Sequence, residues 1–400
     1  MHVPSLATAG PVAPRTFLAS ARMAALVALL MSSRSVAQPV LEIDCDDVPE
    51  ERGPTLENGL PRGLPLDELG AEKYNAGTTF ALDNDLLQFG DRDFDYTGGF
   101  AVTLAGRRAA EWPISLDRAA GWLEPLVPRE GQDASQRFIL HALQIGLVAF
   151  TPDELNVAAR IANDRPYASL LFAANTRTHI DSPSAPVYET SFTLGVLGLD
   201  VAKSIQRRIH EGLGLHEVPE GWDHQVSEGG EPTLRFTWAR QALIASNFQS
   251  RVREFELKWR TEASVGYLTE ASIGASARWG RINTPWWSFT PERADYVAQP
   301  APVIGTSVGG PARERYAWAG MKVRRRLYNV FLQGQFRDSA VEFSSQAIEP
   351  LVVEAWLGMT WQISRVFRLS YVVRYQSAEL KEGPGSRDLR WAGFMLSRDL

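Results

Sequence analysis

Apolar and polar residues alternate along this chain in segments of about ten residues, and this spacing restricts the folds open to it. In Phe367–Gln376 (FRLSYVVRYQ), every second residue from Phe367 is apolar, and the residues between are mostly polar. Successive side chains of a β-strand point to opposite faces, so this segment predicts a strand with one apolar face. Residues 317–324 (AWAGMKVR) follow the same pattern, with Lys322 and Arg324 on one face. Transmembrane barrels show this alternation, although the strands of a soluble sandwich have the same period.

The number of such segments favours the barrel. No run after Ala37 reaches the eighteen or so apolar residues of a transmembrane helix. An even number of strands ending at the last residue is typical of single-chain bacterial barrels, with both termini in the periplasm. We therefore predict an all-β fold, a twelve-stranded antiparallel transmembrane β-barrel over residues 76–400. Its strands are expected near residues 78–87, 98–107, 138–150, 168–178, 187–197, 233–245, 254–267, 271–280, 315–327, 352–363, 367–376 and 389–400.

The N-terminus has the three regions of a secretory signal. Arg15 and Arg22 precede the apolar residues 23–31 (MAALVALLM), and small residues at 35 and 37 follow. We predict a signal peptide over residues 1–37 and, after it, a flexible periplasmic extension over residues 38–75 that is rich in Pro and acidic residues. Cys45 is the single cysteine, so no intrachain disulfide can form.

Charge excludes one class of partner. Without residues 1–37, which hold three Arg and no acidic residue, 38 basic and 47 acidic residues remain and the formal charge is −9. An acidic chain is a poor non-specific ligand for nucleic acid, so we expect no nucleic-acid partner. The sequence also indicates no obligate protein partner.

One short helix interrupts the series of strands. Asp200 is a suitable N-cap for residues 201–211 (VAKSIQRRIHE), and Gly212 and Gly214 follow them. If the first strand runs outward, the connections after strands one, three and five lie at one extracellular rim, and the helix is in the third of them. The same register makes the connections after strands two and eight long and periplasmic, which is unusual for such barrels.

Four separated motifs resemble those of a known family. They are Asn84-Asp85 with Tyr96-Thr97-Gly98-Gly99, then Asp164-Arg165-Pro166-Tyr167-Ala168, then Gln206 and His210 on the helix, and finally Gly221-Trp222-Asp223-His224-Gln225. In this order, they resemble the motifs of the lipid A 3-O-deacylases of Gram-negative outer membranes. The resemblance runs from about Thr79 to the C-terminus. It implies a location in the bacterial outer membrane and lipid A, the anchor of lipopolysaccharide, as substrate.

The resemblance also implies a chemistry, hydrolysis of the ester that links an acyl chain to the 3-position of lipid A. His210 would be the general base that takes a proton from water, and Gln206, one helical turn before it, would orient the imidazole and contact substrate. Asn84 and Thr97 would offer hydrogen bonds to the oxyanion or to the water. Asp85 would help to hold a divalent cation, Ca²⁺ in the family, that polarises the ester carbonyl.

Several positions keep two interpretations. Asn84 and Asp85 are neighbours and would point to opposite faces of a regular strand, so both can serve one site only where the strand ends or bulges. Arg165 is expected to bind a glucosamine phosphate or to form a structural ion pair with a loop carboxylate. Asp91, Asp93 and Asp95 are either secondary cation ligands or solvated loop acids. Gly305–Gly309 (GTSVG) has the spacing of a nucleophile elbow, but the prolines around it indicate a flexible loop.

The chain also departs from the family pattern. Residues 158–160 read Ala-Ala-Arg where some members carry a Lys-Arg pair, and the chain ends in Leu400 rather than an aromatic residue. Two other functions therefore remain open. One is a calcium-dependent outer-membrane phospholipase, which would need a Ser within reach of a His. The other is a non-enzymatic barrel, porin-like or structural.

Overall fold

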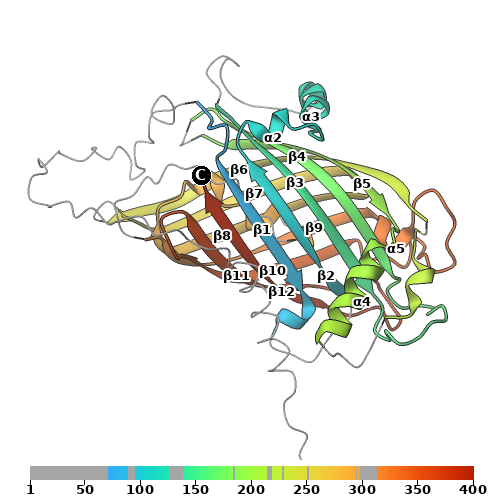
Figure 1. The fold of residues 1–400 in the computed structure, drawn as a ribbon. Helices are drawn as coiled ribbons and strands as arrows, with labels where there is room; N and C mark the ends of the chain where they lie inside the picture. Colours follow the sequence, from blue (N-terminus) through green and yellow to red (C-terminus); the bar gives the residue numbers. More distant parts are fainter. Residues whose placement is uncertain are drawn as a thin grey trace, which may run out of the picture.

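Twelve strands close into a single antiparallel barrel in the computed structural model (Figure 1). The structure describes residues 71–88, 95–126, 138–182, 185–213, 219–227, 229–249, 252–293, 295–297 and 313–400. The strands are β1 (Gly77–Asn84), β2 (Asp95–Ala105), β3 (Phe138–Thr151), β4 (Ala168–Ile180), β5 (Val187–Leu197), β6 (Glu231–Gln249), β7 (Val252–Gly266), β8 (Leu268–Ile282), β9 (Arg315–Asn329), β10 (Leu351–Gln362), β11 (Phe367–Gln376) and β12 (Leu389–Asp399). Each predicted strand is present, so the predicted fold class is confirmed.

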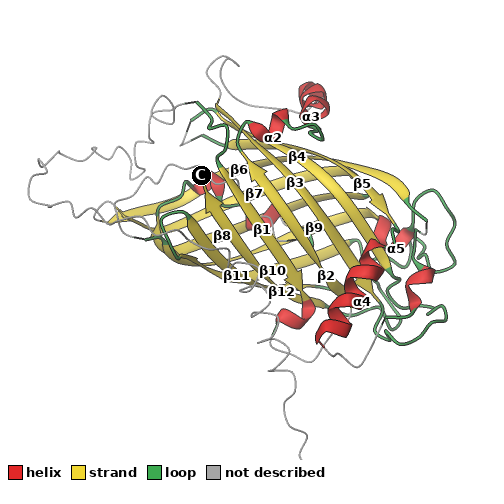
Figure 2. Ribbon diagram, in the orientation of Figure 1, coloured by secondary structure: helices red, strands yellow, loops and turns green. Residues whose placement is uncertain are grey.

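The barrel closes by pairing its first strand with its last, for example Phe80 with Leu396. Every other strand pairs with its neighbours in the chain. One end of the barrel carries the 3-10 helix η1 (Asp85–Leu87) and the helix α4 (Val201–Leu213), and we call it the α4 rim. The other end carries Leu400 and is called the terminal rim (Figure 2). The helix predicted from residue 201 onward is confirmed.

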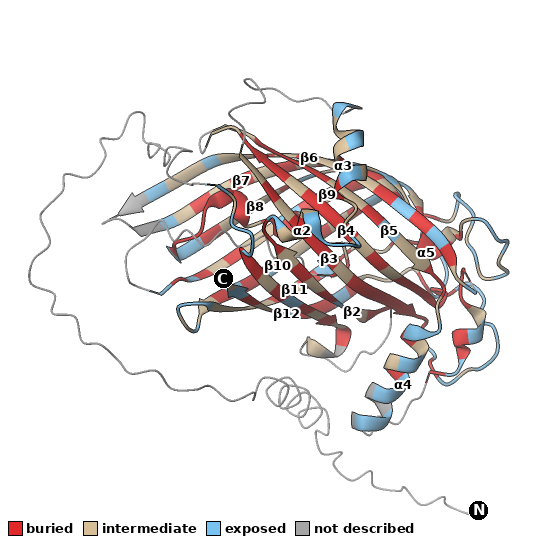
Figure 3. Ribbon diagram, turned by 45° about the horizontal axis from the view of Figure 1, so that its top comes forward, coloured by how far each residue is buried: buried red, intermediate tan, exposed pale blue. Residues whose placement is uncertain are grey.

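The two faces of the wall differ as the alternation predicts. Large apolar side chains are exposed on the outer face, among them Phe80, Val265, Ile273, Met321 and Leu357. Figure 3 shows buried residues alternating with more exposed ones along the strands. The buried charged side chains point inward, and they include Lys258, Arg260, Glu270, Lys322, Arg324 and Glu354. An apolar outer wall around a charged interior suits a barrel in lipid and not a sandwich with an apolar core. No helix in the described part of the chain is long and apolar enough to cross a bilayer.

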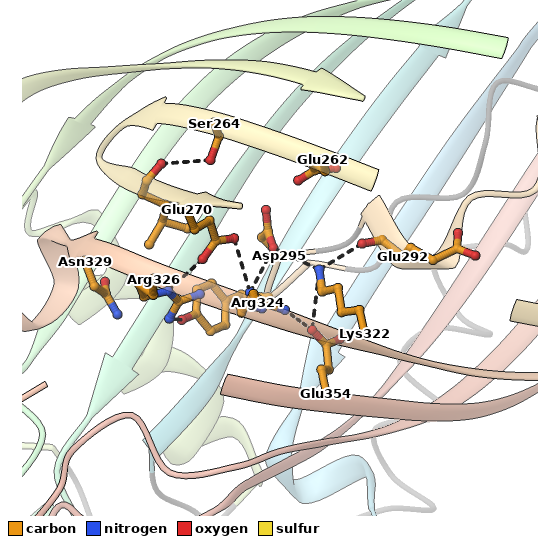
Figure 4. Close-up of polar contacts among 12 residues, drawn as sticks. Glu262, Ser264, Glu270, Glu292, Asp295, Lys322, Arg324, Arg326, Asn329 and Glu354 are labelled. Atoms are coloured by element: carbon orange, nitrogen blue, oxygen red, sulfur yellow. Dashed lines mark hydrogen bonds and ion pairs between the residues drawn. The ribbon is translucent and has the colours of Figure 1, made fainter. Parts of the chain in front are cut away.

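Part of the connection between β8 and β9 fills the lumen. Residues 283–293 and 295–297 contain the 3-10 helices η5 (Trp286–Ser288) and η6 (Pro291–Arg293). Trp286 and Trp287 pack against the inward side chains near the terminal rim. Farther in, Asp295 accepts contacts from Lys322 Nζ at 3.2 Å and from Arg324 Nη1 at 3.1 Å, within a wider charged network (Figure 4). The sequence predicted a long periplasmic connection here, and its described residues occupy the inside of the barrel.

The described part of the long connection after β2, residues 106–126, instead covers the outside of the wall. Its helices α2 (Arg108–Glu111) and α3 (Asp117–Leu123) contact β3, β4 and β5. Asn175 donates to the Ala109 carbonyl at 2.9 Å, and Arg177 Nε donates to Asp117 at 2.7 Å. These helices therefore shield polar side chains of β4 that would otherwise face lipid.

Residues 71–76 run beside the barrel at the terminal rim. Glu72 accepts from the backbone nitrogen of His141 at 2.6 Å, and Arg107 N donates to the Lys73 carbonyl at 3.1 Å. The last residues of the predicted extension, 71–75, thus contact the barrel. The predicted signal peptide and the rest of that extension lie outside the described residues.

Candidate functional site

Two of the predicted catalytic residues meet on the outer face of the wall at the α4 rim. In β1, Thr79, Ala81 and Asp83 point inward, so Asn84 shares the outer face with the exposed Phe80. The Asn84 side-chain nitrogen donates to the Thr97 carbonyl oxygen. Asn84 and Thr97 are thus joined by a direct contact.

A third residue, which belongs to none of the motifs, completes this group. The Thr97 and Thr151 hydroxyl oxygens lie 2.6 Å apart. Thr151 ends β3 and follows Leu147 and Ala149 on the outer face, where both pack with Ala202 of α4. We call Asn84, Thr97 and Thr151 the rim cluster. Its two threonines are buried although they face outward. Of the two strands that carry them, β3 contacts α4 and β2 contacts η1. Figure 1 shows α4 beside this end of the barrel wall.

A bulge in β2 directs Thr97 outward. The pairing of β2 with β3 shifts register between Asp95 and Gly98, so that Tyr96 packs inside against Phe150 while Thr97 faces Thr151. Gly98 has φ +147°, and a Cβ there would lie 2.6 Å from the Asp83 carbonyl oxygen. A side chain at this position would collide with β1. The glycine after Thr97 is therefore what lets β2 approach Asn84.

Asp85 lies where the strand stops. β1 ends at Asn84 and η1 begins at Asp85, so the two neighbours are not held on opposite faces of a strand. For Asn84 and Asp85 to serve one site, the strand had to end or bulge here, and it ends. The Asp85 side chain is buried. Among the residues that the structure describes, no three His, Cys, Asp or Glu side chains are grouped so that they could hold a metal ion.

The helix α4 brings Gln206 to the same region of the wall. Gln206 is 5% exposed, and its Oε1 accepts from Trp222 Nε1 at 2.8 Å. The indole nitrogen can only donate, so this contact fixes which end of the amide is the oxygen. His210 lies one turn farther along α4. Its side chain lies outside the described residues, so its role as a base stays a prediction.

The segment after α4 is held against the helix and the wall by the remaining motif residues. The rings of Tyr167 and Trp222 lie 4.9 Å apart, and Ser169 Oγ donates to Gln225 Oε1 at 2.9 Å. A Cβ on Gly221 would lie 2.6 Å from the Tyr167 ring. Burial raises the pKa of Tyr167 to about 12, so its hydroxyl stays protonated. The motif Gly221–Gln225 therefore positions the segment that holds Gln206.

For Arg165, the structure favours the ion pair over phosphate binding. Its guanidinium is 1% exposed, pairs with Glu379 and lies 5.1 Å above the Phe150 ring. Burial would by itself raise the pKa of Glu379, but Arg165 and Arg326 lower it to about 2. A lipid phosphate could reach Arg165 only after this buried pair had broken. Arg165 thus has, in this structure, the second of its two expected roles, an ion pair that joins loops of the α4 rim.

The acidic loop residues, the Gly305–Gly309 segment and histidines outside α4 separate into two classes. Asp91, Asp93, His216 and the segment Gly305–Gly309 with Ser307 lie outside the described residues. Asp95 is paired with Arg387 at 2.8 Å, which leaves it a structural role. His141 contacts Glu72 at 2.7 Å and His179 contacts Glu124 at 2.8 Å, both near the terminal rim and far along the strands from the rim cluster.

Comparison with known proteins identifies a family and solved structures with a similar fold. The family model described as "Outer membrane protein LpxR" matches residues 60–400. The solved structure of LpxR from Salmonella typhimurium superposes with a TM-score of 0.61 at 15% identity, and the match covers 81% of this chain and 100% of that one. The match to the KdgM porin covers 81% of this chain and 99% of the porin chain at 5% identity, with a TM-score of 0.33. No curated protein sequence matches the chain.

Proposed function

The chain belongs to the LpxR family of outer membrane proteins, and we propose that it is an esterase that removes the 3-O-linked acyl chain of lipid A. Its location is the bacterial outer membrane, in agreement with the family and with its closed twelve-stranded barrel. Lipid A, as the anchor of lipopolysaccharide, is the proposed substrate and partner.

The observation that carries the proposal is the direction in which the rim cluster faces. Asn84, Thr97 and Thr151 lie on the outer face of the wall, beside α4, and not in the lumen. An acyl chain of a membrane lipid runs along the apolar outer wall, and its ester lies near the membrane boundary. A lipid can therefore present this ester at the half-buried Asn84 without leaving the bilayer, and the buried Thr97 and Thr151 lie next to it. A soluble substrate in the lumen could not reach it.

The proposed reaction uses water as the nucleophile. His210 takes a proton from the water, whose oxygen attacks the acyl carbonyl carbon and forms a tetrahedral oxyanion. The bond between the acyl carbon and the 3-oxygen then breaks, and the proton passes to that oxygen. The products are a free fatty acid and a lipid A with a free 3-hydroxyl group.

The paired threonines suit the oxyanion. Between two hydroxyl groups in contact, one hydrogen lies between the oxygens and the other is directed elsewhere. A donor near the developing negative charge stabilises the transition state more than the ground state, because the charge is greatest there. We propose that Thr97 supplies this donor, that Thr151 positions it, and that Asn84 holds the Thr97 backbone.

For the metal, Asn84 of the rim cluster and its neighbour Asp85 offer suitable ligand atoms. Ca²⁺ prefers oxygen ligands, and the Asp85 carboxylate and the Asn84 amide oxygen are of that type. Bound there, the cation would polarise the ester carbonyl. We propose Asp85 as its first ligand.

The test is a comparison of substrates. Purified protein is incubated with lipid A and, separately, with phospholipid, and the products are identified by mass spectrometry. We expect loss of one acyl chain from lipid A at the 3-position and no release from phospholipid. Release from phospholipid alone would support the phospholipase alternative, and no release from either would support a structural barrel.

A further inference from the structure

We propose that the outer wall at the terminal rim binds the phosphate group of an anionic glycerophospholipid, through Arg281 and Arg315. This site lies at the opposite end of the barrel from the rim cluster. Binding there does not depend on hydrolysis of the lipid. It contains a cavity of about 620 Å³ lined by both arginines together with Arg313, Trp361 and Ile363.

The two arginines oppose each other directly across neighbouring strands. Arg281 of β8 pairs in register with Arg315 of β9, and both are exposed. Both lie on the outer face, since Arg278 on β8 and Tyr316 on β9 point inward. Side chains directly opposite in an antiparallel pair lie about 5 Å apart at Cβ, and like charges there are destabilising. A bridging anion would convert this repulsion into attraction.

The acidic residue of the cavity is already engaged elsewhere. Glu314 is buried and accepts from Thr284 Oγ1 at 2.7 Å, and it pairs with Arg368 at 3.1 Å. Within the described part of the chain, the structure gives neither Arg281 nor Arg315 an ion pair. Arg313 adds a third cation, held in place by a hydrogen bond from its Nη1 to the Ile363 carbonyl at 3.1 Å.

The residues around the cavity change from charged to apolar along the wall, as a phospholipid does along its length. Trp361 lies directly across from Arg315 on β10, and Trp279 precedes Arg281 by two residues on the same face. Beyond these indoles, toward the middle of the wall, Leu357 and Met359 are exposed. From the edge of the barrel inward along the wall come the arginines, then the tryptophans, then an apolar band. A phospholipid has its phosphate group, glycerol region and acyl chains in the same order. The cavity is thus continuous with the lipid-facing wall.

The experiment measures lipid binding to the purified full chain in a non-ionic detergent by native mass spectrometry. Phosphatidylglycerol is the probe, with phosphatidylcholine as the zwitterionic control and lipid A as the other source of phosphate. The test variant is Arg281→Gln with Arg315→Gln. The control is Arg325→Gln, which removes an exposed outward arginine from the same strand at the α4 rim. Gel mobility before and after heating verifies that each variant is folded.

We expect phosphatidylglycerol to bind the wild type more tightly than the other two lipids. The double variant should lose about tenfold or more of that affinity, and Arg325→Gln should lose none. In lipid-free detergent the double variant should unfold at a higher temperature than the wild type, because the repulsion is gone. Phosphatidylglycerol should raise the unfolding temperature of the wild type and of Arg325→Gln but not that of the double variant. Equal binding to wild type and double variant, or tighter binding of lipid A or phosphatidylcholine at this site, would overturn the proposal.

Discussion

Thr97 and Thr151 lie on adjacent strands, and their hydroxyl oxygens approach to 2.6 Å on the outer face of the barrel. Thr97 reaches this position through the bulge in β2, and Thr151 is the last residue of β3. The contact adds a residue outside the motifs to a predicted catalytic group. The role of the hydroxyl pair can therefore be tested by substituting Thr151, which belongs to no motif.

We expect Thr151→Val to slow deacylation by about tenfold, less than the loss of a direct oxyanion donor. Valine keeps the shape but removes the oxygen that orients the Thr97 hydroxyl. Thr151→Ser should restore the rate, since it keeps that oxygen. The control is Thr103→Val, which removes a buried hydroxyl from the lumen side of β2. Steady-state rates on lipid A in mixed micelles measure the effect; an unchanged kcat in Thr151→Val would remove this residue from the site.

The cation proposal predicts that a chelator abolishes deacylation and that added Ca²⁺ restores it. Asp85→Asn should raise the Ca²⁺ concentration needed for half-maximal activity, because one negative oxygen ligand is lost. Calcium titrations of the rate, with unfolding temperatures as the check on structure, measure this. Full activity in chelator would exclude the metal and leave Asp85 with an orienting role.

The strands were predictable because their signal is local. In β11, the alternation from Phe367 to Gln376 is carried entirely by neighbouring residues, and the structure keeps the predicted bounds. The position of residues 283–293 and 295–297 inside the lumen was not predictable. Asp295 lies inside because Arg235 and Arg324 of distant strands form its ion pairs, and no local pattern marks such contacts.

The site was predictable in its motif residues and not in its geometry. For Asn84 and Asp85 to serve one site, their strand had to end or bulge between them, and β1 does end at Asn84; the bulge in β2 that turns Thr97 outward had no signal in the sequence. Thr151 had no signal, because its role depends on the register of β3 against the bulge. The burial of Arg165 against Glu379 links residues 214 positions apart, which is beyond the reach of spacing arguments.

The buried contacts of Glu379 predict an acid-sensitive α4 rim. Its folded-state pKa of about 2 is below the value of about 4.3 expected in the unfolded chain. The stabilisation is therefore complete above about pH 4.3 and is lost as the pH falls toward 2. Glu379→Gln should destabilise the wild type by about 3–5 kcal/mol at pH 7, since Arg165 and Arg326 lose their partner. The gap in unfolding temperature between the two proteins should narrow below pH 4; a constant gap would contradict the assignment.

The filled lumen predicts that the protein does not conduct ions as a porin does. Residues 283–293 and 295–297 occupy the interior, with Asp295 held by Arg235, Lys322 and Arg324. We expect no steady conductance of the wild type in a planar bilayer. Asp295→Asn should weaken the contacts and give intermittent opening, whereas Asp388→Asn at the α4 rim should not. A stable open channel in the wild type would favour the porin-like alternative.

The general base is the sharpest prediction, since one side chain carries it. His210→Ala should lower turnover by about a hundred- to ten-thousandfold, the usual contribution of general base catalysis. The barrel should stay folded, because α4 lies in a loop outside the ring of strands. His141→Ala and His224→Ala serve as controls. His141 contacts Glu72 at the terminal rim. In the segment after α4, Trp222 and Gln225 and not His224 make the contacts to Gln206 and Ser169. Both variants should therefore leave the rate within a few-fold of the wild type.

The dependence on pH distinguishes this role from a structural one. A base works when its ring is neutral, so activity should rise with pH through the range in which an imidazole loses its proton, around pH 6.5. His210→Gln can keep a hydrogen bond but cannot take the proton, and its residual activity should no longer follow that rise. Ser307→Ala should leave the rate unchanged, because water and not serine is the nucleophile. If Ser307→Ala abolished activity and His210→Ala spared it, the attack by water would have to be replaced by an acyl-serine mechanism.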